Sequence, residues 1–311
     1  MPGAARATQP RLDAAGLLSG WNEARAAGLN NRAAAIKLAV SEAELLASGC
    51  GHFATRLKPD SPALLARLPE LGEIKCIVRN PWAVLERVGR VHHIEAGTPG
   101  ILHVRADRFE AQCKVALWSK GFALEESSAR GTKLSLQFFT AAGLSAGKFF
   151  LRQDSSVAAF RNLVQAFSAP DQTTEEAVMA ARPVAYLPLE RLVAARHDGL
   201  LEFLEAASRA QQPVQVLVRN GAASLTTTKA VGRVKRSDKG GWVNVLDDGL
   251  DLHLHEDKLR YLRLTRDPDS DSGWFHWFSD RREVALSVRI REGWTQLAQV
   301  ASTIRLPLRQ R

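Results

Sequence analysis

Cysteine and long apolar segments are scarce in this chain of 311 residues. Cys50, Cys76 and Cys113 are isolated, and three cysteines cannot build a disulfide framework. We therefore expect reduced, buried thiols and a cytoplasmic location. No stretch approaches the roughly 20 apolar residues that span a bilayer, so we expect no membrane insertion. The basic, alanine-rich N-terminus lacks a continuous apolar segment and is not typical of a secretory signal.

The motifs of common enzyme classes are absent as well. The chain contains no GxGxxG, P-loop, GxSxG, HExxH or CxxC sequence. His253 and His255 would share one face of a strand, but no third metal ligand accompanies them. We therefore name no catalytic residue, predict no metal site from these residues, and leave open whether the protein is an enzyme.

The composition is that of an ordinary globular protein, with 45% hydrophobic and 24% charged residues. The 42 Lys and Arg residues outnumber the 33 Asp and Glu residues, which gives a formal charge of +9. Such an excess favours an anionic partner. The aromatic residues do not alternate with basic ones as they do on platforms for single-stranded nucleic acid, so nucleic acid is the less favoured partner.

The sequence contains an internal repeat. VRN occurs at residues 78–80 and 218–220, and VGRV occurs at 88–91 and 231–234. Two further segments match, QFF at 137–139 with HWF at 276–278, and KFFLR at 148–152 with SVRIR at 287–291. The offsets are 140, 143, 139 and 139 residues. Four matches in the same order at nearly one offset indicate two copies of a structural unit.

Each copy is predicted to be rich in strands and to end in a helix. Residues 133–139 alternate apolar and polar side chains, as a half-buried strand does, and 74–78, 101–104 and 113–118 are short apolar runs. Ser155 or Ser156 can cap a helix that follows the last strand. Strands joined by short turns are antiparallel, so we predict an α+β fold with two large antiparallel β-sheets and flanking helices.

The remaining segments divide the chain into four parts. Helices are expected at 12–27, at 41–46 behind a capping box that begins at Ser41, and at 61–68 and 200–209. We predict a helical lead-in belonging to the first repeat at 1–73 and the first β-rich repeat at 74–167. A linker at 168–198 precedes the second β-rich repeat at 199–311.

Several segments are similar to those of a known family. They are VSEAELL at 40–46, VRN at 78–80, RVG at 87–89, LQFF at 136–139, LHL at 252–254 and TRDP at 265–268. On these segments the chain resembles the cytoplasmic haemin-degrading factor family, the HemS/ChuX-like haem-utilisation proteins of Gram-negative bacteria. The resemblance covers nearly the whole chain. It implies stacked antiparallel sheets with helices, haem b as cofactor, and a role in using imported haem as an iron source.

The ligand residues implied by the resemblance are mostly replaced. The family's axial histidine precedes the second repeat, but residues 167–196 contain no histidine, which leaves His197 as the nearest substitute. The family's distal arginine aligns with Gln112, and the repeat makes His253 the counterpart of Gln112. Arg289 is a candidate partner for a haem carboxylate.

Three further family positions carry aliphatic residues here. The histidine of the family's RNxxAVH motif aligns with Leu85. A glutamine and a tyrosine that line the family's pocket align with Leu286 and Val288. None of these three side chains can donate to haem iron.

Despite these replacements, the resemblance favours a cytoplasmic haem-binding and trafficking protein in haem-iron uptake and utilisation. Its partners would be haem or another anionic small molecule, together with protein partners in haem uptake. One alternative is an oxygenase-like enzyme that degrades haem. The other is a divergent member that has lost haem binding and acts as an interaction or regulatory module.

Overall fold

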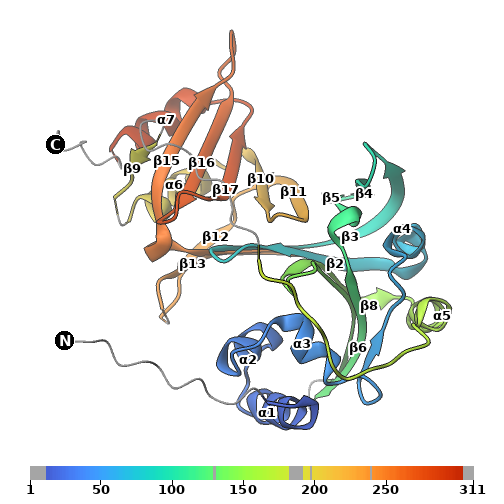
Figure 1. The fold of residues 1–311 in the computed structure, drawn as a ribbon. Helices are drawn as coiled ribbons and strands as arrows, with labels where there is room; N and C mark the ends of the chain where they lie inside the picture. Colours follow the sequence, from blue (N-terminus) through green and yellow to red (C-terminus); the bar gives the residue numbers. More distant parts are fainter. Residues whose placement is uncertain (1–11, 129–130, 182–191, 197, 239, 304–311) are drawn as a thin grey trace, which may run out of the picture.

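Two antiparallel sheets that share one long strand form the centre of the molecule (Figure 1). The computed structural model describes residues 12–128, 131–181, 192–196, 198–238 and 240–303. The shared strand, β3 (Ala83–Ala96), pairs in the first sheet over its first half and in the second sheet over its second half. The predicted α+β class with two antiparallel sheets is confirmed.

The first sheet begins with strands from the second half of the chain and continues with strands from the first half. Its strands follow the order β12 (Arg233–Arg236), β13 (Trp242–Asp247), β14 (Leu250–His255), β3, β2 (Gly72–Arg79), β8 (Ser145–Ser155), β7 (Gly131–Phe139), β6 (Lys120–Ser128) and β1 (Ala54–Arg56).

The second sheet begins with strands from the first half of the chain and continues with strands from the second half. Its order is β3, β4 (Leu102–Ala106), β5 (Glu110–Cys113), β11 (Ala223–Ala230), β10 (Pro213–Arg219), β17 (Val284–Ile290), β16 (Gly273–Ser279), β15 (Leu259–Arg266) and β9 (Val193–Ala194).

Each sheet therefore contains strands from both halves of the chain. In the second sheet β5 pairs with β11, so that Gln112 lies opposite Ser224. In the first sheet β14 pairs with β3, so that His253 lies opposite Val84. Ser224 and Val84 are 140 residues apart, which is the offset of the VRN repeat. One hydrophobic core runs continuously through both halves as a consequence of this exchange.

Seven helices are described, and four of them cover the inner faces of the two sheets, which are the faces that contact this core. The helices are α1 (Ala14–Ala26), α2 (Asn31–Lys37), α3 (Glu42–Ala47), α4 (Ser61–Leu65), α5 (Val157–Phe167), α6 (Gly199–Ala210) and α7 (Trp294–Thr303). Helices α4 and α5 pack on the first sheet, and α6 and α7 pack on the second. Phe203 of α6 contacts Phe275 and Trp277 at ring-centroid distances of 4.8 and 6.1 Å.

Helices α1 to α3 form a separate hydrophobic cluster around Trp21, against Phe122 and Phe139 of the first sheet. They lie beside the outer face of that sheet, opposite α4 and α5 (Figure 1). In the described part of the chain, none of the helices has the length and apolar character that crossing a bilayer requires.

Two side-chain amides join the sheets where β2 and β10 end. The Nδ2 group of Asn80 donates hydrogen bonds to the carbonyls of Arg219 and Ala285, at 3.0 and 2.8 Å. Its Oδ1 accepts from the backbone N–H groups of Trp82 and Ala83, at 3.0 and 2.9 Å. The amide therefore shapes its own turn and holds the other half of the chain at the same time.

Asn220 makes the equivalent bonds in the opposite direction. Its Nδ2 donates to the carbonyls of Arg79 and Ala146, both at 3.0 Å. Its Oδ1 accepts from the N–H groups of Ala222 and Ala223, both at 2.8 Å. The repeated VRN sequence thus encodes a reciprocal pair of contacts between the two halves.

Most of the predicted helix ends agree with the structure. Ser41 and Glu44 form the predicted capping box of α3, and Ser156 caps α5 through the N–H of Ala159. The side chain of Asp60 caps α4 by accepting a hydrogen bond from the N–H of Ala63.

The strand predicted at residues 113–118 is wrong. Strand β5 ends at Cys113, and a 3₁₀ turn follows at Val115–Leu117. The chain must turn there because β5 belongs to the second sheet and β6 to the first. Trp118 anchors the turn by donating from Nε1 to the carbonyl of Ala222 at 3.0 Å.

The three cysteines are free and buried, as predicted. Burial, with a contribution from Cys113, raises the pKa of the Cys76 thiol well above its ordinary value. Burial also raises the pKa of Cys113 to about 12. These thiols remain protonated and unreactive near neutral pH.

We predict that Asn80→Ala lowers the free energy of unfolding by about 2–4 kcal/mol, because four hydrogen bonds are lost and buried carbonyls are left unpaired. Urea unfolding followed by tryptophan fluorescence measures the effect. Asn162→Ala, at an exposed position on α5, is the control and should change stability little. Equal stability of the two variants would contradict the role assigned to Asn80.

Candidate functional site

Each sheet has an outer face that turns away from the shared core. On the second sheet, strand pairing places a row of side chains across this face. Arg263 lies opposite His276, His276 opposite Ser287, Ser287 opposite Leu217, and Leu217 opposite Thr226. Because side chains alternate along a strand, these five share the outer face while their neighbours enter the core.

His276 is the chemically distinctive member of this row. Its Nδ1 lies 2.8 Å from the Ser287 hydroxyl, and its ring stacks on Trp274 with 5.6 Å between ring centroids. Burial, together with the positive charges of Arg219 and Arg263, lowers the pKa of the imidazole to about 4. The ring is therefore neutral at physiological pH, and its Nε2 makes no hydrogen bond with any described residue.

Three arginines lie near this imidazole. Arg289 donates to Asp267 at 3.0 Å, and its guanidinium lies 5.6 Å from the Trp274 ring centroid. Arg219 and Arg263 make no ion pair within the described part of the chain, although both act electrostatically on His276. The neutral imidazole of His276 therefore lies near three guanidinium groups. Those of Arg219 and Arg263 have no carboxylate partner among the described residues.

The residues expected from the sequence are divided between the two sheets. Gln112 is exposed on β5 and lines a small cavity of about 150 Å³ with Leu217 and Thr226. Arg289 lies on the same outer face, with β10, β11 and β17 linking the two positions. The structure therefore brings Gln112 and Arg289 to one face.

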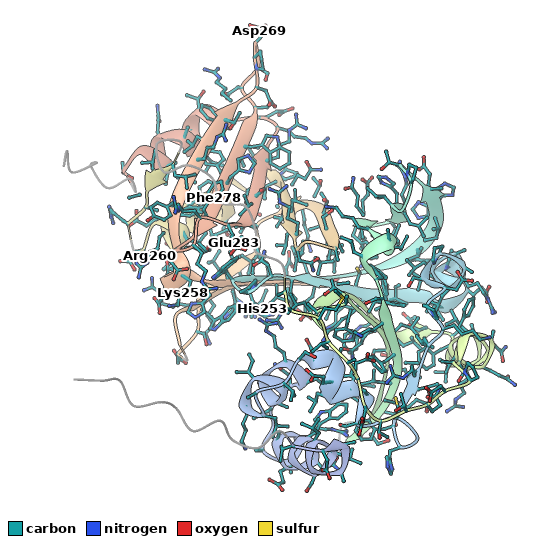
Figure 2. All side chains as sticks on the ribbon, in the orientation of Figure 1. His253, Lys258, Arg260, Asp269, Phe278 and Glu283 are labelled. Atoms are coloured by element: carbon teal, nitrogen blue, oxygen red, sulfur yellow. The ribbon has the colours of Figure 1, made fainter. Side chains whose placement is uncertain are left out.

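His253 lies elsewhere, on β14 of the first sheet, where its Nδ1 is 2.7 Å from Oδ1 of Asn244. Figure 2 labels His253 and, in the second sheet, Phe278 of the strand that carries His276. His197, the ligand favoured from the sequence, lies outside the described residues.

Leu85, Leu286 and Val288, which the alignment assigned to family haem-contacting positions, lie in the hydrophobic core with exposures of 0, 0 and 1%. Their side chains fill the core, so none of them is placed to contact a ligand on the outer face. The residues of β17 that reach the outer face are Ser287 and Arg289. They alternate with Leu286, Val288 and Ile290, whose side chains enter the core.

The outer face of the first sheet forms a cleft of about 730 Å³ beneath α2 and α3. Seven of its described lining residues are Arg or Lys and three are Glu. Lys148 is buried and pairs with Glu42, while Lys75 pairs with Glu86 at 2.5 Å. Arg79 has no such partner among the described residues, and its Nε is buried without a hydrogen bond.

Pairing within the sheets makes the two outer faces counterparts. Gln137 lies opposite Lys148 in the first sheet, as His276 lies opposite Ser287 in the second. The repeat match of QFF with HWF already aligns Gln137 with His276, so the sequence contained a signal for this histidine. It was missed because the Ser287 and arginine contacts of His276 depend on strand pairing.

The outer face of the second sheet has suitable donors for haem. Haem iron takes imidazole as an axial ligand, and His276 is a neutral imidazole whose Nδ1 contacts Ser287 and whose Nε2 makes no hydrogen bond with a described residue. Arg219, Arg263 and Arg289 can pair with carboxylates. In the described residues there is no cluster of three or more His, Cys, Asp or Glu side chains that could hold a metal ion by themselves.

Comparison with known proteins adds an independent finding. The family model described as the haemin-degrading HemS/ChuX domain matches residues 39–167 and 177–276. The hemin transport protein HmuS of Yersinia pestis is 27% identical over 275 residues, covering 75% of this chain and 79% of that protein. The hemin transport protein HemS of Yersinia enterocolitica is 28% identical with the same coverage.

Solved structures show the same fold. Holo-PhuS, a haem-binding protein from Pseudomonas aeruginosa, superposes with a TM-score of 0.84 at 28% identity, covering 93% of this chain and 99% of PhuS. The haem-degrading enzyme ChuS of Escherichia coli O157:H7 superposes with a TM-score of 0.80 at 23% identity, covering 95% of this chain and all of ChuS.

We predict that NMR titration of the His276 ring gives a pKa about 4, well below the ordinary 6.5. Between these values the unfolded chain binds more protons at this site than the folded chain, so His276 makes folding less favourable as pH falls. Exchanging Arg219 and Arg263 for Gln removes two nearby positive charges and should raise the pKa. An unchanged pKa in that double variant would contradict the electrostatic assignment.

Proposed function

Because the chain belongs to the haemin-degrading HemS/ChuX family, we propose that it binds haem and carries it as cargo during the use of imported haem iron. The binding surface in this proposal is the outer face of the second sheet. The observation that carries it is the neutral imidazole of His276, with a free Nε2, among three arginines.

Coordination of iron requires an unprotonated nitrogen, and protons compete with the metal for it. The low pKa of His276 removes this competition across the physiological range. The contact of Nδ1 with Ser287 restricts rotation of the ring, which prepares Nε2 for an axial ligand. His276 therefore takes the role that the sequence alone assigned to His197.

Haem also presents two carboxylates and an apolar ring. The guanidinium groups of Arg219 and Arg263 are the natural partners of the carboxylates, because neither is committed to a protein carboxylate among the described residues. Trp274 and Leu217 supply apolar surface beside His276. Arg289 is already held by Asp267, so it contributes mainly by fixing Trp274.

Carriage is favoured over degradation because the binding face is accessible. Helices α6 and α7 cover the inner face of the second sheet, while Gln112 and Arg219 are exposed on the outer face. Oxygen-dependent opening of a porphyrin ring requires an ordered site that excludes side reactions. An accessible face instead suits the transfer of haem to a protein partner. The buried, reduced thiols support a cytoplasmic location for this transfer.

We predict that purified protein shows a saturable Soret shift at one equivalent of haem, and that His276→Ala abolishes this shift or weakens binding at least tenfold. The loss follows from removal of the axial nitrogen. Absorbance titration in the Soret region measures it.

His52→Ala is the matched control, because His52 is exposed and lies far from the second sheet. His253→Ala and His197→Ala test the ligands expected from the sequence. Loss of the Soret shift in either of these, with His276→Ala unaffected, would contradict the ligand assignment but retain haem binding. The absence of any saturable shift in the unmodified protein would contradict the function itself.

A further inference from the structure

The cleft on the first sheet contains an arginine that the fold itself does not use. Arg79 follows Val78 on β2, and its guanidinium points into the cleft beneath α2 and α3. It makes no ion pair with a described residue, and its Nε is buried without a hydrogen bond. Burial, together with the charge of Arg32, lowers its pKa to about 10. A largely buried, unpaired cation destabilises a protein unless something binds it.

Other groups in the cleft are also incompletely paired. The Oε1 of Gln137 and the Oε2 of Glu42 are buried acceptors without a hydrogen-bond donor among the described residues. Gln137 is only 1% exposed. The three groups lie on different elements, namely β2, β7 and α3, and all line the same cleft. A ligand that satisfies them must carry both an anionic group and N–H or O–H donors.

The cleft also has the size and the apolar surface of a small-molecule site. Its volume of about 730 Å³ falls within the roughly 300–1,000 Å³ typical of such sites. Ile77, Val84 and Phe150 provide apolar surface between the charged groups. The seven basic and three acidic lining residues leave four positive charges in excess, which suits more than one carboxylate.

The equivalence of the two outer faces indicates the shape of the ligand. Lys75, Ile77 and Arg79 of β2 stand where Gln215, Leu217 and Arg219 stand on β10, at the repeat offset of 140 residues. The cleft is therefore a counterpart of the proposed haem-binding face, and in this respect the inference rests on the proposed function.

One of the differences between the two faces concerns a potential iron ligand. Gln137 occupies the position of His276, and the described lining of the cleft includes no His, Cys, Met or Tyr. The cleft consequently offers carboxylate partners and hydrogen-bond acceptors but no strong axial donor to iron.

We propose that the cleft on the first sheet is a second binding site, specific for a metal-free tetrapyrrole that bears carboxylates. Arg79 pairs with a carboxylate, while Gln137 and Glu42 accept hydrogen bonds from the N–H groups of the ligand. Such a molecule carries pyrrole N–H groups where haem carries iron, which matches the exchange of His276 for Gln137. The protein thereby holds two related ligands on equivalent faces.

The test uses biliverdin as the probe and follows its induced circular dichroism during titration of the full-length protein. We expect saturable binding of one equivalent. Arg79→Met should raise the Kd roughly tenfold or more, because a charge-assisted hydrogen bond is lost. Arg79→Lys should restore part of the affinity. Arg281→Met, at an exposed arginine in the β16–β17 turn, is the matched control and should leave the Kd unchanged.

A second readout distinguishes a binding role from a structural one. Arg79→Met should leave the melting temperature of the unliganded protein unchanged or raise it, because it removes an unpaired buried charge. A clear fall in melting temperature with an unchanged Kd would show that Arg79 is structural and overturn the proposal.

Further outcomes separate this proposal from haem binding. His276→Ala should abolish the haem Soret shift and leave the Kd for biliverdin unchanged, and one equivalent of haem should not displace biliverdin. Loss of biliverdin binding in His276→Ala would mean that both ligands use the second sheet, and would overturn the second site. Displacement of biliverdin by low concentrations of inorganic phosphate would identify a general anion site and would also overturn the tetrapyrrole assignment.

Discussion

The arrangement of both sheets depends on the reciprocal hydrogen bonds of Asn80 and Asn220. Each amide closes the turn after its own strand and donates to backbone carbonyls of the other half of the chain. Because these carbonyls belong to the neighbouring sheet, the bonds fix how the two sheets meet. The β5–β11 and β14–β3 pairings lie beside these turns and complete the exchange of strands. Each sheet and the shared core therefore contain residues from both halves.

The two sheets have equivalent outer faces because of the repeat. The side chains on these two faces differ. On the second sheet, His276 is neutral, its Nδ1 contacts Ser287, and three arginines lie near it. On the first sheet, Gln137 takes the same position, and the helices α1 to α3 enclose a cleft that contains buried cations. The repeated scaffold places arginines on both faces, and Gln137 on one face occupies the position of His276 on the other.

Strand pairing places the residues that the resemblance singled out on different faces. The resemblance aligned Leu286 and Val288 with haem-contacting positions of the family, and both are core residues in this chain. Ser287 and Arg289 are the residues of β17 that reach the outer face. Gln112 does lie on this face, whereas His253 occupies the equivalent place on the other sheet. Gln112 and His253, which the repeat aligns with each other, therefore lie on different sheets.

The sequence by itself determined the α+β class, the repeated VRN turns, the capping box at Ser41 and the helix capped by Ser156, because these depend on local periodicity and on neighbouring residues. Only the tertiary structure decided that β5 ends at Cys113 and that His276 lies on the outer face of the second sheet. The pKa of His276 depends on burial and on Arg219 and Arg263, and the site at Arg79 depends on helices packed against distant strands. Strand pairing and desolvation are long-range effects, so no local pattern specifies them.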